Sequence, residues 1–379
     1  MALLTDRAET NRQGVVLDGV QYLRGLCAVI VVISHCNGII GKPEYYSRMA
    51  IPDWHVASLF AVAAFFSISG FIILIASLDA CGQPRASTTE FARRRFVRIL
   101  PFLWLCTIGY NALSWAGTAQ VDWSAFARTL VVWPIGELKP NVAWSLRHEL
   151  LFYAIYALAI LGLRRRLMLL AAWFGASIVF YIVSYDLGAA IPVAGRAWFE
   201  VLKVIMGGDH GANFQFAIGM GLAYLYLTHP ERLPLGTVSP LVLLVLTAVA
   251  CVAVTVSTLP EGLPVTIMWT ALVAPILASA ICVKPAGGRA GTIGLVLGNA
   301  SFSIYLVHNP IVLVLLAIAR KLQLELGSQM QLLGFLAFSI LAAVLGGVMV
   351  HYLVEAPLIR LCDRWTRRIP RIAPASPAR

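Results

Sequence analysis

Two side chains that are costly inside a membrane stand in the first apolar run of the chain. Arg24 and His35 are eleven residues apart, so on a helix they share one face and lie about 16 Å apart along the axis. The arm of coenzyme A has a similar length, with phosphates at one end and a thioester at the other. The pair therefore suggests an arginine that holds the phosphates and a histidine that meets the thioester, unless Arg24 only reaches the interface and His35 is a core residue.

A second candidate binding site lies at the start of a later apolar run. Arg95 and Arg98 are three positions apart, which places them on one face of a helix. Planar guanidinium groups bind phosphate oxygens through two hydrogen bonds, so such a pair predicts a clamp for a pyrophosphate or a 3′-phosphate.

A carboxylate between two hydroxyl groups forms the third candidate. Ser145, Glu149 and Tyr153 follow one another at intervals of four residues and so lie on one stripe of a helix. A buried carboxylate beside a histidine raises the basicity of the imidazole and fixes its tautomer, so we expect Glu149 to tune His35. The alternative is a structural Glu149 paired with Arg147 or with another helix.

The last candidates come from the C-terminal third of the chain. Tyr305 and His308 are three positions apart, and either could bind substrate or be structural. His351 and Glu355 are four positions apart, and we expect a local pair there.

The composition indicates that these side chains belong to a membrane protein. The chain has 379 residues, of which 59% are hydrophobic and 12% charged, against about 25% charged in soluble domains. The sequence predicts an all-α, polytopic membrane protein with about ten spans. The ten predicted spans cover residues 19–40, 59–79, 98–117, 143–163, 167–187, 211–228, 238–258, 265–283, 292–319 and 331–353.

The distribution of charge predicts the orientation of these spans. With the N-terminus inside, roughly 19 Lys and Arg residues fall in inner segments and roughly 8 in outer ones, which favours N-in and C-in. The net charge of +11 therefore fits membrane lipids as partners, and we expect no nucleic acid. We interpret residues 1–355 as one transmembrane domain and 356–379 as a basic, disordered cytoplasmic tail. The seven scattered cysteines lack metal-ligand spacing, so we expect no metal.

Taken together, these segments resemble the acyltransferase-3 family of polytopic membrane O-acyltransferases, which modify sugars of exported glycans. The resemblance runs nearly end to end, and Arg24 with His35 matches the Arg-x10-His element of the family, while Arg95 and Arg98 match its RxxR element. The other matching pieces are Phe65 to Phe71, Trp144 to Leu146 with Glu149, Ser301 to Pro310 and Tyr352 to Pro357.

The resemblance implies an enzyme of the cytoplasmic (inner) membrane that moves an acyl group, most simply acetyl, from acyl-CoA to a sugar hydroxyl of a glycan or glycolipid. Arg24, Arg95 and Arg98 would bind the donor, with Ser145, Tyr153, Tyr305 and His308 as further substrate contacts. His35 would act as general base or transient acyl carrier, assisted by Glu149. The alternative is a secondary transporter or a flippase for lipid-linked saccharides, because intramembrane Arg, His and Glu also mark transport pathways.

Overall fold

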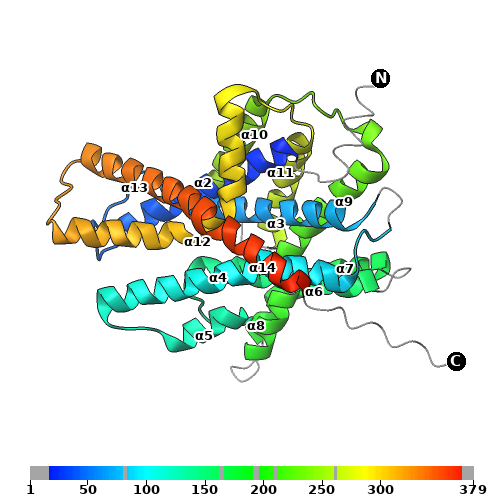
Figure 1. Cartoon of the computed structure of the whole chain (residues 1–379), viewed down its shortest axis with the longest axis horizontal. Helices are drawn as coiled ribbons and strands as arrows, with labels where there is room; N and C mark the ends of the chain where they lie inside the picture. Colours follow the sequence, from blue (N-terminus) through cyan, green and yellow to red (C-terminus); the bar gives the residue numbers. More distant parts are fainter. Residues whose placement is uncertain are drawn as a thin grey trace.

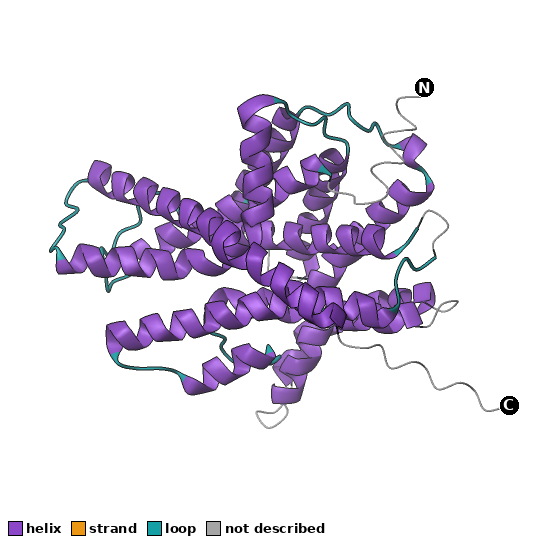
Figure 2. Cartoon of the chain, in the orientation of Figure 1, coloured by secondary structure: helices purple, strands orange, loops and turns teal. Residues whose placement is uncertain are grey.

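The computed structural model describes residues 17–79, 83–161, 166–190, 196–208, 211–259 and 263–368, and helices dominate this part of the chain, with no β-sheet among these residues (Figures 1 and 2). The α-helices are α2 (Asp18–Ile40), α3 (His55–Ser77), α4 (Thr88–Thr118), α5 (Trp123–Val131), α6 (Trp144–Leu161), α7 (Arg166–Ala190), α8 (Arg196–Ile205), α9 (Ala212–Thr228), α10 (Pro240–Val256), α11 (Leu263–Ile281), α12 (Gly288–Lys321), α13 (Gln329–Val350) and α14 (Ala356–Arg368). A π-helical turn, His351–Glu355, joins α13 to α14.

The all-α class is confirmed, and each of the ten predicted spans coincides with one helix. Within the described residues, six helical stretches are long and apolar enough to cross a membrane; they include α2, α3, α4, α11 and α12, and the sixth runs from α13 into α14. The chain is therefore an integral membrane protein, while ten spans and the N-in, C-in orientation stay predictions.

Helix α2 lies at the centre of the bundle, packed against α3, α11, α12 and α13. Glycines permit its close approach to α12, because a Cβ atom at Gly25 would lie 2.8 Å from the Cβ of Leu297, and one at Gly298 would clash with the carbonyl oxygen of Gln21. Small residues at such crossings allow two backbones to meet in a membrane bundle. Tight packing on both sides holds Arg24 and His35 in fixed positions.

Buried aromatic rings connect the neighbouring helices. Phe152 of α6 stacks on Phe216 of α9 with ring centroids 4.0 Å apart, and both side chains are fully buried. Stacked and edge-to-face rings fix the relative position of the elements that carry them. Helix α6, which carries Ser145, Glu149 and Tyr153, is thereby held against the core.

The C-terminal segment differs from the expected disordered tail. Residues through Arg368 form α14, which lies beside α4 (Figure 1), and only 369–379 fall outside the described residues. An ion pair ties the two helices together: Arg93 of α4 donates to Asp363 at 2.7 Å and to Thr366 at 2.8 Å. The prediction of a disordered tail is wrong for residues 356–368, because this segment has an apolar face on which Leu358 packs against the core.

Removing this ion pair should loosen α14 without unfolding the bundle. We expect Asp363→Asn to speed tryptic cleavage within α14, because Arg93 then loses a charged partner that is about two-thirds buried. Limited proteolysis in detergent measures the effect. Glu137→Gln is the control, because the Glu137 side chain is 75% exposed and its ion pair with Lys139 lies in the segment between α5 and α6. Equal cleavage rates for both variants and the wild type would show that the ion pair does not hold α14.

Candidate functional site

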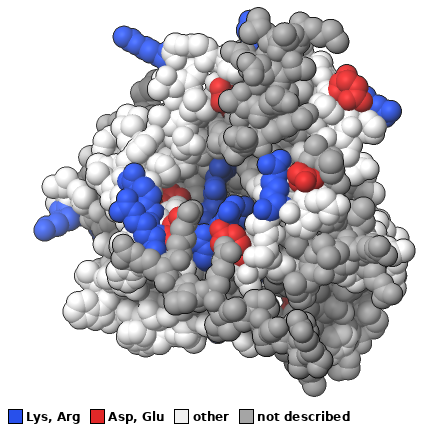
Figure 3. All heavy atoms as spheres, turned by 45° about the vertical axis from the view of Figure 1, so that its right-hand side comes forward, with Lys and Arg blue, Asp and Glu red and all other residues white. Residues whose placement is uncertain are grey.

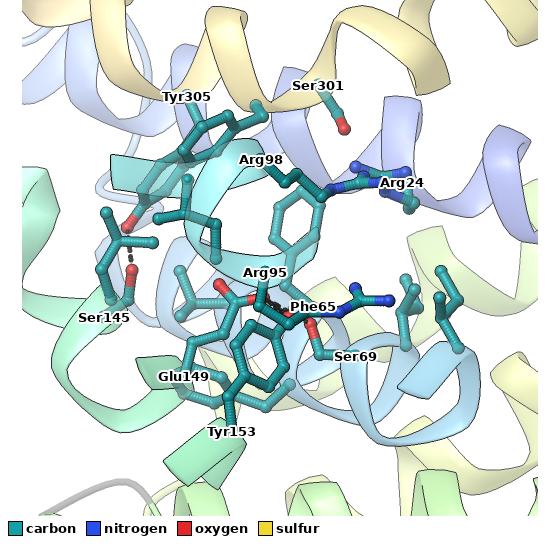
Figure 4. A pocket seen from close by; sticks show the side chains of 17 residues that line it. Arg24, Phe65, Ser69, Arg95, Arg98, Ser145, Glu149, Tyr153, Ser301 and Tyr305 are labelled. Carbon is teal, nitrogen blue, oxygen red and sulfur yellow. Dashed lines mark hydrogen bonds between the residues drawn. The ribbon is translucent and has the colours of Figure 1, made fainter. Parts of the chain in front are cut away.

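A cavity lies among α2, α3, α4, α6 and α12 and holds most of the predicted site residues (Figure 4). It comprises about 800 Å³ of space, including the part open to the outside. Apolar side chains from α3, α4, α6 and α12 form much of its wall. Its polar lining consists of Arg24, Ser69, Arg95, Arg98, Ser145, Glu149, Tyr153, Ser301 and Tyr305.

The four arginines at the start of α4 divide into two groups. Arg93 and Arg94 form ion pairs with Glu90 at 2.8 and 2.7 Å, one turn earlier on the same helix. Arg95 and Arg98 line the cavity and form no ion pair among the described residues. The helix periodicity explains the division, because positions 95 and 98 share a face that the carboxylate of Glu90 does not cover. Arg95 and Arg98, the predicted pair, therefore remain available to bind a ligand.

Arg95 is held by aromatic rings in place of acidic groups. Its guanidinium carbon lies 5.6 Å from the ring centroid of Phe91 and 5.5 Å from that of Tyr153, which are cation–π distances. Its Nε atom is buried and has no hydrogen-bond partner. Such stacking orients a guanidinium while leaving its hydrogen-bond donors available. Arg24, on α2, donates to Gln21 at 3.2 Å.

The cavity carries more positive than negative charge. Arg24, Arg95 and Arg98 contribute three guanidinium groups to its lining, against the single carboxylate of Glu149. In Figure 4 the side chains of Arg24 and Arg98 extend to the same side of the cavity. Three like charges around one enclosed space repel each other unless an anion is present. The arrangement suits a multiply charged anionic ligand.

The basic side chains also gather on the surface. Figure 3 shows Lys and Arg residues, with acidic residues among them, in the middle of the face that lies to the right in Figure 1. That end of the molecule carries the start of α4 and the end of α14. A concentration of positive charge there would raise the local concentration of an anionic substrate.

Glu149 lies in the cavity, but its contacts differ from those expected. It accepts hydrogen bonds from Ser69 of α3 at 3.1 Å and from Tyr153 one turn later. The expected contact of Glu149 with His35 is wrong, because His35 bonds elsewhere. The alternative pairing with Arg147 is also absent, since Arg147 donates to the backbone carbonyls of Trp133 and Gly136.

Glu149 is connected to Arg95 through Tyr153. By accepting a hydrogen bond from Tyr153, it orients the ring over which the Arg95 guanidinium lies. Ser145, the third member of the predicted stripe, lines the cavity but lies 3.0 Å from the hydroxyl of Tyr305. Tyr305 also donates to the carbonyl of Val142 at 2.9 Å. The stripe was predicted correctly as one face of α6, and its three members have different partners.

His35 contacts His308, the histidine that the sequence indicates as a candidate in the C-terminal third of the chain. Its Nδ1 atom lies 2.8 Å from Nε2 of His308, and the two rings stack with centroids 5.1 Å apart. His308 is fully buried on α12. Neither histidine belongs to the cavity lining. Tyr305 links the cavity to the histidine pair, since it lines the cavity and its ring centroid is 6.2 Å from that of His308.

Some residues of the site had no assigned role in the sequence. Ser69 binds Glu149, and Ser301 lines the cavity with a buried Oγ atom that has no hydrogen-bond partner. Both lie in segments that carry the family resemblance, but serines in apolar helices usually bond their own backbone, which gives no signal of function.

The local pair of His351 and Glu355 is confirmed at 2.8 Å, and Glu355 also accepts from Ser303 at 2.5 Å.

Comparisons with known proteins agree with this picture. A family model described as an acyltransferase domain matches residues 17–351, which include every predicted site residue. The chain is similar to the exopolysaccharide production protein ExoZ of Rhizobium meliloti (strain 1021), with 28% identity over 312 residues, or 79% of this chain and 89% of that protein. No solved structure matches the chain.

Proposed function

The chain belongs to the acyltransferase-3 family and is a membrane O-acyltransferase, and from this premise we propose that it moves an acetyl group from cytoplasmic acetyl-CoA to a hydroxyl of an exported or lipid-linked glycan. The similarity to an exopolysaccharide production protein supports a glycan as acceptor. The observation that carries the proposal is the cavity lined by Arg24, Arg95 and Arg98, which have no acidic partner among the described residues.

The phosphate groups of the donor would bind at these arginines. Arg95 and Arg98 project from one face of α4, and Arg24 approaches from α2. Guanidinium groups bind phosphate oxygens through pairs of charge-assisted hydrogen bonds. The unpartnered Nε atom of Arg95 and the unpartnered hydroxyl of Ser301 would then gain partners from the donor. The donor would then lie at the end of the molecule that we propose to be cytoplasmic, in the cytoplasmic (inner) membrane.

The acyl group would be transferred at His35. Eleven residues of helix separate Arg24 from His35, about 16 Å along α2, which the arm of the donor can span. His35 would take the proton of the acceptor hydroxyl while the hydroxyl oxygen attacks the thioester carbon. The C–S bond then breaks, and the proton passes to the leaving sulfur. As an acyl carrier, His35 would instead attack the thioester carbon with Nε2, and the C–S bond would break to release the CoA thiolate. The acceptor hydroxyl would then attack the acyl carbon, the bond to Nε2 would break, and the hydroxyl proton would pass to the thiolate.

The donor arm must pass Tyr305 to reach His35. Tyr305 and Phe65 both line the cavity, with ring centroids 6.2 Å apart, and the ring of Tyr305 is also 6.2 Å from that of His308. We propose that these rings move aside when the donor binds. Rotation of aromatic side chains at an enclosed site is a common way to exclude water until the substrate arrives.

A series of competitors tests the proposed donor site. We expect CoA, 3′-dephospho-CoA and pantetheine to displace labelled acetyl-CoA with decreasing affinity, because each lost charge-assisted contact costs about 1.5–3 kcal/mol, or about 10- to 100-fold. Binding to the purified protein in detergent measures the series. Pantetheine competing as well as CoA would contradict phosphate binding at the arginines.

A further inference from the structure

The bonds around His308 determine which nitrogen of each histidine carries a proton. Nδ1 of His308 lies 3.1 Å from the carbonyl oxygen of Ile304, one turn earlier on α12. A carbonyl oxygen can only accept a hydrogen bond, so Nδ1 of His308 carries the hydrogen. A neutral imidazole has one N–H group, and Nε2 of His308 is therefore an acceptor.

The same reasoning extends to His35. Its Nδ1 atom lies 2.8 Å from Nε2 of His308, so a hydrogen bond requires that His35 Nδ1 donates. Nε2 of a neutral His35 is then left with a lone pair and without the proton. The chain of bonds runs from the Nδ1–H of His35 to His308, and from the Nδ1–H of His308 to a backbone carbonyl that cannot change its role.

We propose that His308 is the positioning residue for His35, fixing its tautomer and ring orientation so that Nε2 is the atom that accepts the proton or the acyl group. The proposal rests on the proposed function, because it assigns the reacting atom of the same site. His308 does not contact the donor cavity. His308 takes the role expected of Glu149 from the sequence, and the hydrogen bonds of Glu149 go to Ser69 and Tyr153.

A neutral partner suits this position better than a carboxylate. His308 is fully buried in the bundle, where a charged group without a counter-charge is costly. An imidazole fixed by a backbone carbonyl accepts the hydrogen bond without carrying charge. When His35 takes the proton of the acceptor hydroxyl at Nε2, its Nδ1–H bond to His308 becomes charge-assisted and therefore stronger. The proton then leaves on the sulfur of the donor, and both rings return to the neutral state.

Two substitutions at His308 separate positioning from packing. In His308→Gln the side-chain oxygen can accept from His35 at about the place of Nε2, whereas His308→Leu fills space without an acceptor. We expect His308→Leu to lower kcat by about 10²-fold or more, as loss of the correct tautomer does in other enzymes. The Kd for acetyl-CoA should stay within about twofold, because the cavity is unchanged. We expect His308→Gln to recover most of the lost kcat.

Equal kcat values for the two variants, with donor binding intact, would overturn the proposal. The tautomer can also be observed in the wild type without any turnover, by nitrogen-15 NMR of histidine-labelled protein, with His35 assigned from the His35→Gln variant. We expect a protonated Nδ1 and an unprotonated Nε2 at His35, and the reverse would overturn the proposal even if the leucine variant failed to fold. Absence of acyl transfer by the wild type, with this tautomer observed, would instead contradict the proposed function.

Discussion

His35→Ala is expected to lower acyl transfer by about 10²- to 10⁴-fold while the protein still inserts and binds acetyl-CoA. The substitution removes the imidazole whose unprotonated Nε2 has no hydrogen-bond partner among the described residues, since Nε2 of His308 is occupied by His35. It leaves the arginines of the cavity in place. Initial rates with labelled acetyl-CoA and a glycan acceptor measure the loss, and donor binding is measured on the same preparation. A correctly folded variant with near-normal turnover would remove His35 as the reacting group.

A matched control and a trapping experiment sharpen this result. His229→Ala changes a histidine at the end of α9 whose side chain is 43% exposed, and it should leave the rate unchanged. In the absence of acceptor, rapid quenching of the wild type distinguishes the two roles of His35. Label that stays on the protein in the wild type and is lost in His35→Ala would indicate an acyl carrier. No protein-bound label, with transfer intact, would indicate a general base.

Arg95→Gln is expected to weaken acetyl-CoA binding by about 10- to 100-fold, because a donor phosphate loses a charge-assisted hydrogen bond worth about 1.5–3 kcal/mol. Acceptor affinity should change little, since Arg95 lies in the cavity and away from the histidine pair. Equilibrium binding of labelled acetyl-CoA to the purified variant measures the effect. Because Arg95 has no ion pair among the described residues, its removal leaves no buried acidic group without a partner.

The neighbouring residue supplies the control. Arg94→Gln removes the same charge from the same helix turn, but Arg94 is more than half exposed and paired with Glu90. We expect its donor affinity to stay within about twofold of the wild type. Equal losses in the two variants would attribute the effect to the general positive charge at this end of the molecule, and the proposed clamp would be wrong.

The sequence predicts the helices well because their signal is local. Each apolar run had to form a helix, since a chain in lipid must satisfy its own backbone hydrogen bonds. The shared faces of Arg95 with Arg98, and of Glu149 with Tyr153, also follow from the helical period. The C-terminal helix was missed because its stability depends on a distant partner, Arg93, which lies 270 residues earlier in the chain.

The partners across the bundle could not be predicted. His35 and His308 are 273 residues apart, and nothing in the spacing of either segment indicates that their rings meet. Chemistry alone predicts the pairing of Glu149 with His35, and this prediction is wrong, because α6 directs that carboxylate towards Ser69 of α3 and into the cavity. Likewise, all four arginines of the α4 cluster look alike in sequence, and only their contacts separate Arg95 and Arg98 from the pair bound to Glu90.

The most direct test of the central claim is acetyl transfer by the purified, detergent-solubilised protein from radiolabelled acetyl-CoA to a crude glycan fraction, beside the His35→Ala variant. We expect label in the glycan with the wild type and none above background with the variant, although both bind the donor. Donor that fails to bind and label that never reaches glycan, from a folded wild-type protein, would contradict the claim. That result would direct attention to another acyl donor first and then to transport of a lipid-linked saccharide.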